Sequence, residues 1–130
     1  MRRLLRELSF AALAWFILFA VSVCIFHLKH LHPALFESFM GIALIGSTVG
    51  LGCFYLRRCT DDLVIHGVRI GVTWMMANWL LDGLMFSSGP ITMSLHQYLS
   101  EIAGAYLMIP LITVGLAAAA AQATRTRLSN

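Results

Sequence analysis

Four long apolar stretches, separated by short connectors that carry most of the charge, constrain the fold of this chain more than any other feature. They cover about residues 9–28, 34–56, 63–86 and 97–121. Each is close to the roughly 20 residues that an α-helix needs to cross about 30 Å of hydrocarbon. With 59% hydrophobic and 12% charged residues, the chain lies outside the range of ordinary soluble domains. The sequence therefore predicts an all-α integral membrane protein, a four-helix bundle.

The connectors hold only about five to ten residues each. Connectors this short join antiparallel neighbouring helices and leave no room for a soluble domain. We therefore expect residues 1–130 to form a single transmembrane domain in a lipid bilayer. A chain of 130 residues has a small core of its own, which favours a homo-oligomer or association with a membrane-protein partner.

The basic residues predict an orientation in the membrane. Eight of the nine Lys and Arg residues fall on one side of the expected bundle, namely Arg2, Arg3, Arg6, Arg57, Arg58, Arg69, Arg125 and Arg127. Only Lys29 falls on the other side. Because loops rich in Lys and Arg stay in the cytoplasm, both termini are predicted to be cytoplasmic, with the bacterial inner membrane as the expected location. No small-residue cleavage site follows the first apolar stretch, which is therefore interpreted as an uncleaved anchor.

A stripe of small and polar residues runs along the third stretch. Its members recur at three- and four-residue steps, which place them on one helix face: Gly67, Gly71, Trp74, Asn78 and Asp82. Asn78 and Asp82 lie one turn apart, so they can share a hydrogen bond or jointly hold a cation or a proton. A carboxylate within a membrane span is a functional-site hypothesis by default, because a lone charge there is costly.

The fourth stretch begins with a second polar pair, Gln97 and Glu101, one turn apart. In antiparallel helices, Asp82 and Glu101 each lie about one turn from the outer boundary, so they are expected to be level with one another. Glu37 lies just inside the same boundary. These residues predict an outward-facing polar vestibule. The expected site residues are Asp82, Glu101, Asn78, Gln97, Glu37, Tyr98 and Trp74, with Trp74 as a wall, a cation–π partner or a packing residue.

Two interpretations of this vestibule remain open. In the functional one, clustered carboxylates bind or move a cation, a proton or a small solute. In the structural one, Asp82 is protonated or paired with Lys29 or a histidine, and Asn78 and Gln97 form hydrogen bonds that hold helices together. The first predicts a small transport protein. The second predicts a non-catalytic accessory or scaffold subunit of a larger membrane complex.

Other chemistry has weaker support in the sequence. His27 and His30 form an i, i+3 pair that, with His96, is a candidate zinc or copper site. No closed ligand motif is present, and an interfacial or pH-sensing histidine cluster is the competing interpretation. The three cysteines do not form a disulfide framework and are expected to be free thiols. No enzyme motif and no cofactor motif occurs, so neither catalysis nor nucleic-acid binding is expected.

Small residues predict where helices approach closely. Gly46 and Gly50 form a G-x-x-x-G motif in the second stretch, which we expect to be the central packing helix. Gly67 and Gly71 repeat the motif in the third stretch. Either motif can serve packing within one subunit or a homodimer face. Pro110 lacks an N–H group and is expected to kink the fourth helix.

Overall fold

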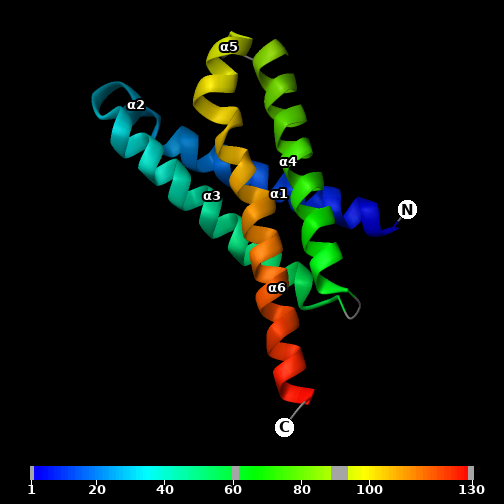
Figure 1. Cartoon of the computed structure of the whole chain (residues 1–130). Coiled ribbons are helices and arrows are strands. Elements are labelled where there is room, and N and C mark those ends of the chain that lie inside the picture. Colours follow the sequence, from blue (N-terminus) through cyan, green and yellow to red (C-terminus); the bar gives the residue numbers. More distant parts are fainter. Residues whose placement is uncertain (1, 60–61, 89–93, 129–130) are drawn as a thin grey trace.

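The computed structural model describes residues 2–59, 62–88 and 94–128, and its regular elements there are all helices (Figure 1). The long helices are α1 (Arg2–Cys24), α3 (Pro33–Leu56), α4 (Leu63–Ser88) and α6 (Met108–Leu128). A short helix, α2 (Phe26–Leu31), connects α1 to α3. Before α6 lie α5 (Leu95–Tyr98), the π-helix η1 (Leu99–Ala103) and the 3₁₀ helix η2 (Ala105–Leu107).

The distribution of side chains suits a hydrocarbon solvent. In the described part of the chain, three helical segments are long and apolar enough to cross a membrane: Arg3–Cys24, Pro33–Leu56 and Ala105–Thr126. Large apolar residues such as Ile42 and Leu111 are exposed, whereas the polar residues Asn78 and Thr113 are buried. Soluble domains keep residues of these types in the opposite places. The chain is therefore an all-helical protein with the character of a membrane protein.

Helix α4 is the exception among the long helices. Its 26 residues are enough for a span by length. Its polar residues, Asn78 and Asp82 among them, lower its hydropathy, and α4 is not one of the three apolar segments. The fourth span remains a prediction.

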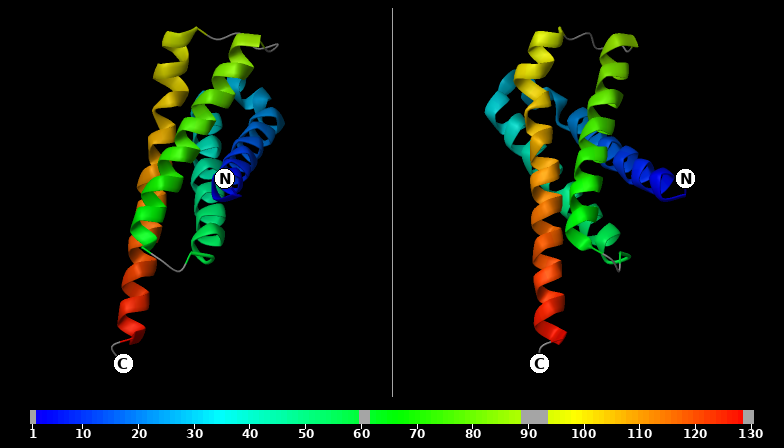
Figure 2. Two further views of the ribbon diagram at one scale, coloured as in Figure 1. Left: turned by 90° about the vertical axis from the view of Figure 1, so that its right-hand side faces the viewer. Right: turned by 45° about the vertical axis from the view of Figure 1, so that its right-hand side comes forward.

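The long helices form two layers (Figure 2). Helices α4 and α6 pack along each other in one layer, and α1 and α3 pack in the other. Helix α1 also contacts α4, and α3 contacts α6, whereas α3 and α4 touch very little. The expectation that successive helices are packed neighbours therefore fails at the α3–α4 step. The indole of Trp74 meets residue 7 and Asp82 meets Trp15, so α1 and α4 run in the same direction.

Prolines mark the starts of two helices. Pro33 is in the first turn of α3, where its missing N–H costs nothing. Pro110 is likewise in the first turn of α6. Pro110 cannot bond to the carbonyl of Tyr106, and the segment before α6 departs from α-helical geometry as η1 and η2. The kink predicted in the fourth helix at Pro110 stays a prediction.

The space around the glycines shows that the helix with the closest contacts is not the one that the sequence predicts. A Cβ atom added at Gly67 would lie 2.5 Å from Ala117 Cβ, and one added at Gly71 would lie 2.6 Å from Pro110 Cα. The motif in α4 is therefore the contact surface for α6. At Gly46 and Gly50 an added Cβ meets no atom of the described residues within 4 Å. Helix α4, and not α3, is the central packing helix, which corrects the sequence-based expectation.

Gly71→Ala is expected to lower the free energy of unfolding by about 1–3 kcal/mol, because the new methyl group forces α4 away from α6. Gly50→Ala is the matched control, since its methyl group enters open space and alanine favours the helix. Reversible unfolding in mixed micelles measures both. Equal stability of the two variants would contradict the close α4–α6 contact.

Candidate functional site

A buried carboxylate, Asp82, lies where α4 meets α1 and the segment before α6. Its residue is 4% exposed. Trp15 Nε1 donates a hydrogen bond to Oδ1 at 2.7 Å. The hydroxyls of Tyr106 and Tyr98 donate to Oδ2 at 2.8 and 3.2 Å. These four residues, called the Asp82 cluster below, join three parts of the chain that are far apart in sequence.

The donors of the Asp82 cluster are all neutral. An indole N–H can only donate, so Oδ1 must accept, and two tyrosine hydroxyls satisfy Oδ2 in the same way. This donor set suits the ionised carboxylate. Protonation of Oδ2 would require one hydroxyl to turn and accept. Asp82 makes no ion pair with Lys29 or a histidine; among the described side chains, the ion pair present is that of Arg69 with Glu7.

A cavity of about 840 Å³ opens beside the Asp82 cluster, between α1, α3, α4 and the start of α6. Asp82 and Glu37 both line it, together with Lys29 and Ser22. Most of the remaining wall is apolar or aromatic, with Trp15, Phe19, Phe26, Phe36, Phe86 and Tyr106 as its aromatic residues. The structure therefore places an acid at an apolar, aromatic cavity, which we call the Asp82 cavity.

The other sequence-predicted site residues are placed differently. Asn78 is completely buried and donates to the carbonyl of Trp74 at 2.8 Å, so its amide does not share a hydrogen bond with Asp82. Trp74 is also buried, and its indole N–H donates to the backbone carbonyl of Glu7, in a second polar cluster. The side chains of Gln97 and Glu101 lie outside the part that the structure describes. Trp15 and Tyr106 carry the site but were not among the predicted residues.

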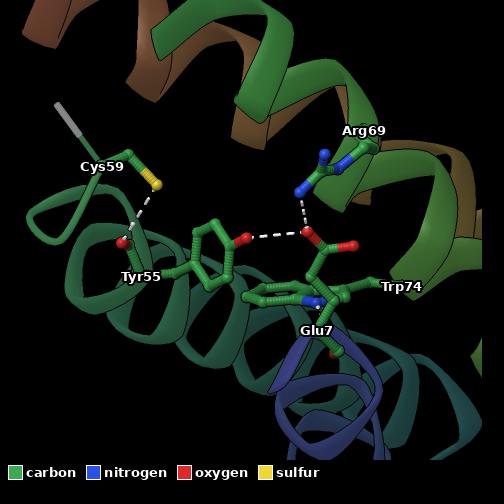
Figure 3. A network of polar contacts seen from close by, with 5 residues as sticks. All are labelled: Glu7, Tyr55, Cys59, Arg69 and Trp74. Atoms are coloured by element: carbon green, nitrogen blue, oxygen red, sulfur yellow. Dashed lines mark hydrogen bonds and ion pairs between the residues drawn. The ribbon is translucent and has the colours of Figure 1, made fainter. Parts of the chain in front are cut away.

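A second buried carboxylate, Glu7, was also missed by sequence reasoning. Figure 3 shows it facing Tyr55 and Arg69, whose side chains come from α3 and α4. The Tyr55 hydroxyl donates to Glu7 Oε1 at 2.8 Å, and Arg69 forms an ion pair with the same oxygen. Trp74 Nε1 donates to the Glu7 backbone carbonyl at 3.1 Å. This Glu7 cluster therefore holds α1 against two other helices.

The two clusters stand on the same pair of helices. Residues 7 and 15 of α1 face residues 74 and 82 of α4, so each helix separates the clusters by eight residues, or about 12 Å. Asn78 lies between them on α4, and its Oδ1 is buried without a hydrogen-bond partner. The α1–α4 contact thus carries a polar group at every turn or two, inside an apolar bundle.

Metal and thiol chemistry receive no support from the described side chains. His27, His30 and His96 are exposed, and the described residues contain no group of three or more histidine, cysteine or acidic side chains that could hold a metal ion. Cys24, Cys53 and Cys59 are free. Cys59 donates to the Tyr55 carbonyl at 3.7 Å, and burial raises the pKa of its thiol. Cys59 therefore has the environment of a structural thiol.

No protein-family model, no curated protein and no solved structure matches this chain significantly. The protein is defined by its fold and site as a helical membrane-type protein with a buried acid at an aromatic cavity.

Proposed function

We propose that this chain is a small, non-catalytic membrane protein that binds a cationic solute at the Asp82 cavity and moves it across the membrane. The observation that carries the proposal is a buried aspartate with only neutral partners, facing a cavity large enough for a solute. A negative charge that the protein does not neutralise is an attractive site for a cation. Rotation of a tyrosine hydroxyl lets the same carboxyl group hold a proton when the cation has left.

The positions of the basic residues and the lengths of the helices support the proposed orientation in the membrane. Four spans, with α4 as the span that carries Asp82, place both termini in the cytoplasm. The Asp82 cavity then opens toward the outer side, because Lys29 in α2 and Glu37 near the start of α3, which line it, lie at the end opposite the arginine-rich ends. In a bacterial cell this is the periplasmic side of the inner membrane.

One observation favours the alternative, an accessory subunit. Gly46 and Gly50 present a flat face on α3 that no described residue contacts within 4 Å of an added Cβ atom. Such faces allow close approach of a second helix in a membrane. A homo-oligomer or a larger partner can use this face while the Asp82 cluster serves only to hold helices together. Isolation as a single stable oligomer under gentle extraction would weigh against a dedicated scaffold.

The proposal predicts that a bound cation stabilises the folded protein and that the effect needs the Asp82 charge. The melting temperature of the detergent-purified protein would be measured against sodium, potassium, magnesium and tetramethylammonium at several pH values. A ligand at a hundred times its Kd stabilises by about 2.7 kcal/mol. We expect Asp82→Asn to abolish this rise, because it keeps the side-chain shape and removes the charge.

Asp62→Asn is the matched control, because Asp62 is an exposed aspartate just before α4 and outside the cavity. It is expected to respond to cations as the unchanged protein does. A flat response to every cation, with Asp82→Asn as stable as the unchanged protein, would contradict cation binding and direct attention to the accessory role.

A further inference from the structure

The Asp82 cavity has walls that are unsuited to a small inorganic ion. Its volume of about 840 Å³ falls within the roughly 300–1,000 Å³ of sites that enclose drug-sized molecules. Its lining is mainly aromatic and aliphatic. A bare metal ion requires several oxygen or nitrogen ligands that converge at short distance. The lining offers few such groups for a volume of this size.

Asp82 itself is poorly placed to coordinate a metal directly. Both of its carboxylate oxygens already accept hydrogen bonds, from Trp15, Tyr98 and Tyr106. The Trp15 N–H cannot turn to become a ligand. Among the described residues no cluster of three metal-binding side chains exists. Asp82 can therefore attract a cation through its charge, but it does not provide an open coordination site for a metal ion.

The aromatic wall next to Asp82 supplies the complementary surface. Trp15, which bonds to Asp82, stacks on Phe19 with ring centroids 5.3 Å apart and planes at 8°. Aromatic faces attract organic cations through the ring quadrupole. The protein itself places an ammonium group in this way, because Lys29 Nζ lies 6.0 Å from the Phe36 ring centroid in the same cavity.

The charges that line the cavity leave a net attraction for a positive ligand. Glu37 and Lys29 both belong to the α2–α3 end of the cavity, and their opposite charges offset one another. Asp82 projects from α4 on the other side, and its described partners are uncharged. When Asp82 is ionised, the remaining charge at the aromatic wall is negative.

We propose that the occupant of the Asp82 cavity is a lipophilic organic monocation, attracted by the charge of Asp82 and packed among Phe19, Met40 and Phe86. This assignment rests on the proposed function, since it names the class of cation. The cavity volume, the aromatic lining and the uncharged partners of Asp82 all fit such a ligand.

Binding of tetraphenylphosphonium to the full chain in lipid nanodiscs tests the assignment, with empty nanodiscs subtracted. We expect saturable binding, with affinity reduced at least tenfold in Asp82→Asn and about threefold to tenfold in Phe19→Leu, which removes a ring face but keeps an apolar side chain. Tetraphenylborate, with the same shape and the opposite charge, is expected not to bind in a saturable way. This comparison uses the unchanged protein and therefore does not depend on the folding of any variant.

The outcomes separate the ligand class from the proposed function. Stabilisation by sodium or magnesium that depends on Asp82, without saturable tetraphenylphosphonium binding, would overturn the organic-cation assignment and leave cation binding intact. Absence of saturable binding by every cation tested would overturn both. Equal binding of the phosphonium and the borate would show an apolar pocket without charge selectivity, and would also overturn the assignment.

Discussion

Arg69→Met is expected to lower the free energy of unfolding by about 3–5 kcal/mol, because it leaves a buried carboxylate without its cation. The Glu7 side chain is 3% exposed, and the Tyr55 hydroxyl would be its remaining side-chain donor in the cluster. Glu7→Gln is expected to cost less, about 1–3 kcal/mol. The Arg69 side chain that it leaves behind is 45% exposed and can turn toward solvent or headgroups. Reversible unfolding in mixed micelles measures both variants.

Arg57→Met is the matched control for this prediction, because Arg57 is an exposed arginine at the end of α3. Its effect is expected to stay within about 0.5 kcal/mol. Replacement of both partners, as Glu7→Leu with Arg69→Met, is expected to recover part of the loss, since neither charge is then buried alone. If Arg69→Met costs no more than Arg57→Met, the ion pair does not hold α1 to α4.

The sequence predicts the helices well because helix formation in such a chain depends on local features. Long apolar stretches, Pro33 and the charged connectors mark where helices run and end, and α3 and α4 cover the expected stretches. Helix α1 ends at Cys24, before the predicted end at residue 28, and α6 begins only at Met108, because α5, η1 and η2 form the first part of the fourth stretch. The sequence does not contain the order in which these helices pack. The contact of α1 with α4 was not predicted, because short connectors suggest that neighbours in sequence are neighbours in space.

The two identical glycine motifs also show that the sequence does not reveal which helices pack together. Gly46 with Gly50 and Gly67 with Gly71 have the same spacing, and within the described part of the chain the second pair, not the first, meets another helix. The difference lies in the partner: Pro110 and Thr113 of α6 come close enough to exclude a side chain at Gly71. A motif predicts that a backbone can be approached. It does not predict which helix approaches it.

The sequence predicts only part of the polar site, because it does not reveal which helices pack together. The stripe on α4 singles out Asp82, because helical periodicity identifies a face from one sequence segment. Trp15 and Tyr106 were missed, since a donor on another helix is recognised only when the packing is known. Glu7 was assigned no role from the sequence, yet Glu7, Ala11, Ala14 and Leu18 recur at three- and four-residue steps and are all buried. That stripe was the available signal for a buried acid in α1.

Asp82→Ala is expected to lower the free energy of unfolding by about 3 kcal/mol or more, because it removes the acceptor for three donors at once. Each buried donor left without a partner costs about 1–3 kcal/mol, and Tyr98 and Tyr106 are both buried. Asp82→Asn is expected to cost only about 1 kcal/mol. Its amide oxygen can still accept from Trp15, and its NH₂ group can donate to a tyrosine hydroxyl that has turned. Unfolding in mixed micelles compares the two variants.

The difference between these two variants separates the two roles that Asp82 can have. A stable Asp82→Asn protein that no longer responds to cations would mean that the hydrogen bonds hold the helices and the charge binds the solute. An Asp82→Ala protein as stable as the unchanged one would contradict the three-donor network itself. If Asp82→Asn is stable and still responds to cations, the network is structural and the cation binds elsewhere. The first result therefore assigns the carboxylate to both packing and binding, and the last assigns it to packing alone.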